Sequence, residues 1–122
     1  MRSDRTLKKH FNRINKKFFD SKLPSSTCVR WLDPDVDDPR LEDALFGFAD
    51  RTDDGYHKYQ IVLSRKMCTP ASSRATTLIH EMIHVYLELK DDHGEAFERV
   101  RLMLSDKGIF RKGAVIHGLT IF

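Results

Sequence analysis

The ten residues from Leu78 to Leu87 constrain this chain most, because they combine an apolar helical pattern with three side chains that titrate below pH 7, two histidines and a glutamate. Two of these, His80 and His84, are four residues apart, which places them one above the other on a helix, about 40° apart around its axis. Their neighbours are mostly aliphatic, so the helix is expected to be buried. A buried polar group without a partner costs about 1–3 kcal/mol. The pattern therefore favours a helix whose histidines share a partner such as a metal ion.

The spacing of these side chains is typical of a zinc site with hydrolytic chemistry. Two imidazoles on one helix face can bind a single Zn²⁺ at about 2.0–2.1 Å each. Glu81 lies about 100° further round the helix, so its carboxylate borders the ion without having to bind it. A carboxylate in that position can accept a proton from the water that attacks a peptide carbonyl. His80-Glu81-x-x-His84 is the arrangement found in zinc-dependent peptidases.

A catalytic zinc site takes three protein ligands, so the helix supplies only two of them. His93 is one candidate for the third, since Gly94 beside it permits a sharp chain reversal over the same helix face. Glu95 is its main rival. Glu88 continues the row formed by the two helix histidines, but three ligands in one straight row close poorly around an ion. Weaker candidates are Asp91, Asp92 and His117, whereas His10 and His57 are expected to be ordinary surface histidines.

Length and composition predict one domain, residues 1–122, with a core over about residues 4–105 and a tail or terminal strand over 106–122. No apolar run approaches the roughly 18 residues that a membrane helix needs, and the N-terminus lacks the apolar segment of a secretory signal. Cys28 and Cys68 form no Cys-x-x-Cys pair, which excludes a cysteine-only zinc module. We therefore expect reduced thiols in an intracellular protein, either cytoplasmic or associated with the nucleus or nucleoid.

The net charge of +3 is small, but its distribution along the chain is uneven. The region Arg2–Lys22 carries eight basic side chains against two acidic ones, a balance of +6, and residues 33–54 carry nine acids against two bases, a balance of −7. The region Arg99–Lys112 returns to +4. Basic clusters can follow a phosphate backbone, so the two basic regions are candidate DNA contacts if they share one face. The alternative is that both are solvated helix faces.

Hydrophobic periodicity predicts an α+β fold with an N-terminal helix, a three-stranded, mainly antiparallel sheet, the histidine-bearing helix, a further helix and an extended C-terminal tail. The first helix has an apolar stripe, formed by Leu7, Phe11, Ile14 and Phe18. The Asp54-Gly55 pair predicts that the second and third strands form an antiparallel hairpin, whose exposed edge could pair with a substrate strand. The expected boundaries are a helix over 4–20, strands over 27–32, 44–50 and 59–64, a helix from 69–73 to about 89, a helix over 95–105 and a tail over 114–122.

The two histidine-containing stretches, His80–Leu87 and His93–Phe97, combine a His-Glu-x-x-His helix with a following His-Gly-x-x-Phe motif. Upstream, Phe11–Pro24 forms a helix pattern that ends in Leu-Pro, and Val29–Trp31 and Ile61–Ser64 are strand-like. These motifs and the order of the helices and strands, which together cover most of the chain, resemble the SprT-like metallopeptidases, the family that includes Spartan.

The resemblance implies a small zincin-like domain with one catalytic Zn²⁺, bound by His80, His84 and His93, and with Glu81 as the general base. It also implies a zinc-dependent endopeptidase that cleaves protein substrates, including proteins bound or crosslinked to DNA. Many family members continue into a cysteine-rich zinc ribbon, so a chain that ends at Phe122 is expected to be a minimal member or a fragment.

The competing interpretation is a zinc-stabilised module that binds DNA or protein without protease activity. An intact Glu81 argues against it, because a purely structural zinc site has no use for that carboxylate.

Overall fold

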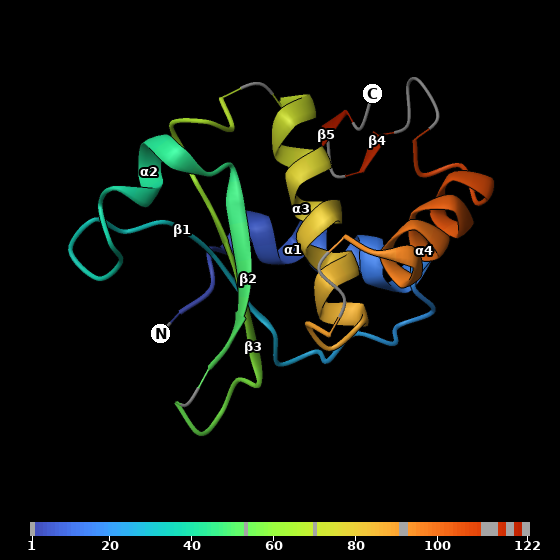
Figure 1. The fold of residues 1–122 in the computed structure, drawn as a ribbon, viewed down its shortest axis with the longest axis horizontal. Coiled ribbons are helices and arrows are strands. Elements are labelled where there is room, and N and C mark those ends of the chain that lie inside the picture. Colours follow the sequence, from blue (N-terminus) through green and yellow to red (C-terminus); the bar gives the residue numbers. More distant parts are fainter. Residues whose placement is uncertain are drawn as a thin grey trace.

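The structure is a computed structural model that describes residues 2–52, 54–69, 71–90, 93–110, 115–116 and 119–120. Figure 1 shows a small sheet with α1 and α3 against one face and α4 beyond α3, on the side away from the sheet. The helices are α1 (Arg5–Phe18), α2 (Leu41–Ala44), α3 (Ala71–Tyr86) and α4 (Glu95–Asp106). The strands are β1 (Cys28–Trp31), β2 (Gly47–Arg51), β3 (Tyr59–Leu63), β4 (Val115–Ile116) and β5 (Leu119–Thr120). The predicted α+β class is confirmed.

The central sheet has the strand order β1-β3-β2 and is mixed. β2 and β3 form the predicted antiparallel hairpin, in which Ala49 lies opposite Ile61. β1 pairs with β3 in parallel, with Val29 opposite Ile61. β2 therefore lies at one edge of the sheet, and its outer side meets no other strand of the described chain. β4 and β5 form a separate two-stranded antiparallel pair within the predicted C-terminal tail.

The core lies between the sheet and the helices. The predicted apolar stripe of α1 is buried, and α3 adds a second set of buried side chains, which includes Leu78, Ile79, Met82 and Ile83. Alternate sheet residues face this core, as Val29 and Ile61 do. Both cysteines are buried and free. His10 is only 4% exposed, so its assignment as a surface histidine was wrong: it lies three residues after Leu7 and therefore shares the apolar side of α1.

The region between β1 and β2 departs from the prediction. The second strand was expected to begin at residue 44, but Leu41–Ala44 form the short helix α2 and the strand begins at Gly47. The Asp38 carboxylate accepts a hydrogen bond from the Arg40 N–H, and two acids lie in the first turn of α2, where they favour a helix N-terminus. These local interactions leave Leu45 and Phe46 in an exposed connection outside the sheet.

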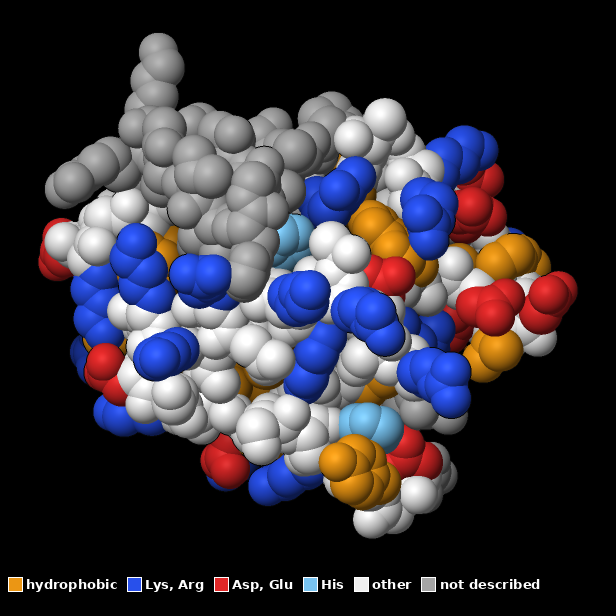
Figure 2. Space-filling view, turned by 180° about the vertical axis from the view of Figure 1, so that it is seen from behind, with side chains coloured by type: hydrophobic (Ala, Val, Ile, Leu, Met, Phe, Trp, Pro, Cys, Tyr) orange, Lys and Arg blue, Asp and Glu red, His pale blue; other side chains and the backbone are white. Residues whose placement is uncertain are grey.

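The basic side chains of the N-terminal region gather on the outward face of α1. This helix contains six basic residues and no acidic one. Its exposed side chains line a hollow of about 570 Å³, formed by Lys9, Asn12, Arg13, Lys16 and Lys17. Figure 2, the view from behind, shows Lys and Arg side chains spread across this face. Four basic residues of α1, Lys9, Arg13, Lys16 and Lys17, therefore lie together on one face of the helix.

The second basic region is different, because its described charges have acidic partners nearby. Arg99 pairs with Glu95, and Arg101 pairs with Glu98, both within α4. Lys107 lies 3.5 Å from a carboxylate oxygen of Asp20. The remaining two basic residues of this region, 111 and 112, lie outside the described residues. Within α4, the positive charge is largely offset by acidic side chains of the same helix.

No helix in the described part of the chain combines the length and the apolar character that crossing a membrane requires.

β2 and α3 approach each other closely at Gly47. A Cβ atom at this position would lie 2.7 Å from the Val62 carbonyl oxygen and 2.9 Å from Cγ2 of Thr77. Real Cβ atoms do not come so close to such atoms, so only glycine lets the strand and the helix pack at this distance.

We predict that Gly47→Ala lowers the free energy of unfolding by about 1–3 kcal/mol, because the added methyl group overpacks this contact. Denaturant unfolding measures the change. Thr77→Ser removes the Cγ2 atom, so the double variant should recover part of the missing stability, whereas the contact with the Val62 carbonyl remains. A Gly47→Ala protein as stable as the wild type would contradict the close packing of β2 on α3.

Candidate metal centre

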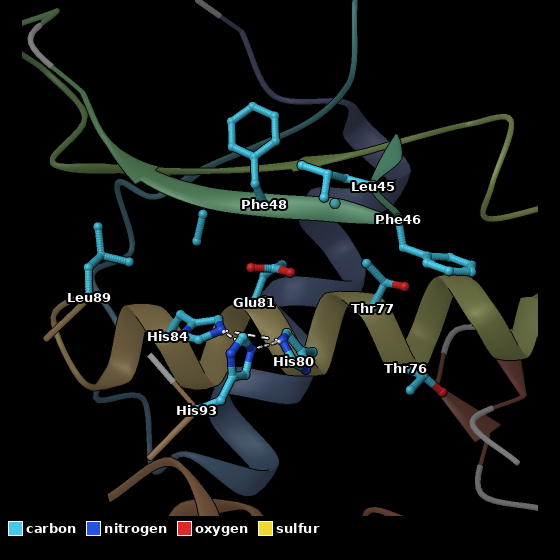
Figure 3. Close-up of a pocket in the computed structure, with 12 residues that line it drawn as sticks. Leu45, Phe46, Phe48, Thr76, Thr77, His80, Glu81, His84, Leu89 and His93 are labelled. Carbon is cyan, nitrogen blue, oxygen red and sulfur yellow. Dashed lines mark hydrogen bonds between the residues drawn. The ribbon is translucent and has the colours of Figure 1, made fainter. Parts of the chain in front are cut away.

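Three histidines converge on one point beside α3. His80 and His84 project from the helix, and His93 comes from the connection that leads into α4 (Figure 3). The Nε2 atom of His93 lies 2.8 Å from that of His80 and 3.0 Å from that of His84, and the two helix nitrogens are 3.3 Å apart. These side chains form a group that could hold a metal ion.

The donor set fits a tetrahedral ion. Nitrogens bound at about 2.0–2.1 Å to one zinc ion would lie about 3.3 Å from each other at tetrahedral angles. The observed separations are equal to this value or a few tenths of an ångström shorter. All three ring atoms are Nε2, the imidazole nitrogen that commonly serves as a metal ligand. Three protein donors are the number found in catalytic zinc sites, in which the fourth position is taken by water or substrate.

His93 reaches the helix face through an unusual backbone conformation. α3 ends at Tyr86, and Glu88 and Leu89 both have positive φ, which reverses the chain direction after the helix. His93 itself has φ 66°, in the left-handed region, at a cost of about 1–2 kcal/mol. Gly94, expected to make the sharp turn, has φ −85° and caps the start of α4 instead. The strained residue is thus the candidate ligand rather than the glycine beside it.

Phe97 forms an apolar support under all three imidazoles. Its ring centroid lies 4.9 Å from those of His80 and His84 and 5.0 Å from that of His93. Phe97 is itself buried, at 6% exposure, and belongs to the core cluster. The first turn of α4 therefore fixes the ring positions as well as the helix packing.

The environment keeps His80 neutral. Burial, together with the neighbouring His84 and His93, lowers the pKa of His80 to about 4. A neutral imidazole retains the lone pair that a metal ion needs, whereas a protonated ring would repel the ion. At neutral pH the ring is therefore ready to bind a cation without first losing a proton.

Glu81 lies beside the histidines and points toward β2 (Figure 3). Only 7% of this residue is exposed, and burial raises the pKa of its carboxyl to about 7. A group with a pKa near neutrality can both accept and return a proton during a reaction at that pH. Its carboxyl group lies beside the histidines, as the helix spacing predicted.

The other candidate ligands lie elsewhere. Glu95 pairs with Arg99, and Glu88 pairs with Lys90. His57 contacts the Asp54 carboxylate in the turn after β2, at 2.7 Å. Asp91, Asp92 and His117 lie outside the described residues. Among the described residues, only the three histidines approach one another closely enough to share an ion.

A cavity of about 590 Å³ opens over the histidines, between α3 and β2. Its walls include residues that the sequence did not single out: Leu45, Phe46, Gly47, Phe48, Ala49, Thr76, Thr77 and Leu89. Periodicity placed the first five in a strand but not beside the histidines, since that depends on which edge of the sheet faces α3. The sequence signal that could have identified them is the predicted hairpin, whose exposed edge strand would have to lie beside the histidine-bearing helix.

Comparison with known proteins identifies a family. A family model described as the SprT-like family matches residues 7–114, whereas no curated protein and no solved structure matches. The matched segment contains the three histidines, Glu81 and Phe97. Because the match covers nearly the whole chain, the resemblance noted on the motifs is confirmed, and the chain belongs to the SprT-like family.

Proposed function

We propose that this protein is a zinc-dependent endopeptidase. The observation that carries the proposal is the convergence of three Nε2 atoms within 3.3 Å of one another, beside the buried carboxylate of Glu81. The three histidines and Glu81 line a cavity that is bordered by the open edge of β2. Family membership is consistent with a metallopeptidase-like domain.

In this proposal His80, His84 and His93 hold the ion through Nε2. When bound, zinc supplies Lewis-acid chemistry, which polarises a peptide carbonyl and makes water more acidic. The Glu81 carboxylate accepts a proton from the attacking water and then delivers it to the nitrogen of the leaving amine. Burial supports this role, because it gives the carboxyl of Glu81 a pKa of about 7.

A substrate in extended conformation can add to the free edge of β2. This strand pairs only with β3 among the described strands, and its other side borders the cavity. Strand addition holds the substrate through main-chain hydrogen bonds, so many sequences can be accepted in an unfolded segment. The arrangement suits cleavage within a chain rather than removal of a terminal residue.

We further propose that DNA binds the basic face of α1, so that the substrates include proteins bound or crosslinked to DNA. The support is the run of exposed Lys and Arg side chains on this helix, without an acidic residue between them. α1 runs behind α3 in the view into the cavity (Figure 3). DNA on this face would leave the cavity open for a protein chain.

The ligand assignment predicts that His93→Ala lowers zinc affinity by more than about 100-fold, because the ion is left with two of its three protein donors. Glu95→Ala should leave the affinity unchanged, since Glu95 pairs with Arg99. Competition with a chromogenic chelator measures both, and elemental analysis gives the zinc content of each protein. Full zinc occupancy in His93→Ala with a decrease in Glu95→Ala would transfer the ligand role to Glu95.

The base assignment predicts that Glu81→Gln lowers kcat by about 10²–10⁴-fold while zinc content and thermal unfolding stay close to those of the wild type. Cleavage of an unfolded protein and of a DNA-bound basic protein, with and without single-stranded DNA, measures the rate. If zinc-loaded wild type cleaves none of them, the alternative of a zinc-stabilised binding module holds. If Glu81→Gln cleaves as fast as wild type, another group is the base.

The proposed DNA contact predicts that Lys9→Gln, Lys16→Gln and Lys17→Gln, combined, weaken DNA binding by about tenfold or more at moderate salt. The slope of log K against log salt should fall by up to about 0.9 for each phosphate that the variant no longer neutralises. Fluorescence anisotropy with labelled DNA measures both. Arg99→Gln with Arg101→Gln is the matched control, because these charges already have acidic partners. Equal weakening in the control, or none in the triple variant, would contradict the assignment to α1.

A further inference from the structure

We propose that the cavity selects substrates with a large apolar side chain directly after the cleaved bond, and that Leu45 and Phe46 form the subsite that receives it. This inference rests on the peptidase function proposed above and specifies its substrate class. It comes from three features of the structure. Two exposed apolar side chains lie at one end of the cavity, and some backbone N–H and C=O groups of β2 point to its open edge. The third feature is the direction in which β2 runs past the three histidines.

Leu45 and Phe46 are unusually exposed for apolar side chains beside a site. They are 40% and 48% exposed, respectively, and both line the cavity that contains Glu81 and the three histidines. Phe46 projects toward Thr77 of α3, whereas the ring of Phe48 points away from the helix (Figure 3). Exposed apolar surface that continues into a binding cavity is typical of a surface that is covered when a ligand binds.

The hydrogen bonds of the hairpin show which backbone groups of β2 face the cavity. Phe46 accepts from the Ser64 N–H at 2.8 Å, and Thr52 donates to the Lys58 carbonyl at 3.0 Å. In an antiparallel pair, alternate residues turn their N–H and C=O groups toward the partner strand. The even-numbered residues of β2 therefore face β3. Gly47 and Ala49, which lie between them, direct their N–H and C=O groups to the open edge, and both line the cavity.

The direction of β2 fixes where each half of a substrate lies. β2 begins beside Thr77 and runs toward the end of the cavity where Leu89 lies near His84 (Figure 3). Antiparallel pairing is slightly more stable for each residue than parallel pairing, so a substrate strand is expected to run opposite to β2, from Leu89 toward Phe46. With the cleaved carbonyl at the histidines, the next residue falls on the Leu45–Phe46 side.

The composition of the cavity wall favours an apolar occupant. Apart from Glu81 and the three histidines, its lining consists of aliphatic and aromatic residues, glycine and two threonines. Neither Lys nor Arg is among the described residues that line it, so an acidic side chain would find no partner there. Burial of a Phe or Leu side chain against two apolar residues is favourable in proportion to the area removed from water.

The test uses peptides that differ only at the residue after the cleaved bond, which is Phe, Leu, Ser or Asp. We expect kcat/KM of the zinc-loaded wild type to be about tenfold or more higher for Phe and Leu than for Ser and Asp. Phe46→Ser should reduce this ratio to within about threefold. Leu102→Ser is the matched control, because Leu102 is 50% exposed on α4, away from the cavity lining, and should keep the wild-type ratio.

A second readout does not depend on cleavage. Zinc-loaded Glu81→Gln should bind the Phe peptide about tenfold more tightly than the Ser peptide in fluorescence anisotropy, and adding Phe46→Ser should remove the difference. Equal binding of the two peptides, or a difference that persists without Phe46, would overturn the subsite. A preference at the residue before the cleaved bond would overturn the substrate direction. If wild type cleaves nothing, the peptidase proposal fails, and the binding measurement alone decides the apolar subsite.

Discussion

The packing of Phe97 against three imidazole rings is the contact on which the site depends. Three nitrogens can lie within 3.3 Å of one another only if the start of α4 is fixed relative to α3. Phe97 does this because it is a core residue and a neighbour of every ring in the cluster. Weaker core packing at this point would displace the third ligand as well, so the stability of the α3–α4 contact and the geometry of the site are not independent.

The sequence was most informative where a pattern is local. The apolar stripe of α1 and the four-residue spacing of His80 and His84 each depend on a few neighbouring residues, and both were predicted correctly as parts of helices. His93 was different, since its distance in sequence allowed Glu95 as a rival. Its φ of 66° shows why spacing alone was insufficient: the chain reaches the site through a conformation that no periodic pattern encodes.

The parts that could not be predicted depend on contacts between distant segments. α2 has only four residues and no buried side chain, so it has no hydrophobic signature. The positive charges of α1 could be counted in the sequence, but the pairing of Arg99 with Glu95 and of Arg101 with Glu98 could be identified only in the structure. The two regions have similar basic composition, but the arginines of α4 have acidic partners within the helix, whereas α1 contains no acidic residue.

Gly47 connects the fold to the cavity most directly. The absence of a side chain lets α3 approach β2, because a Cβ atom would meet Thr77 and the Val62 carbonyl. Glu81 lies one helical turn after Thr77, so the same close contact brings its carboxylate under the strand edge. The edge at this point presents the backbone groups of Gly47 to the cavity. A larger residue would therefore do more than strain the packing: it would move the strand that is proposed to hold the substrate away from the group that is proposed to transfer the proton.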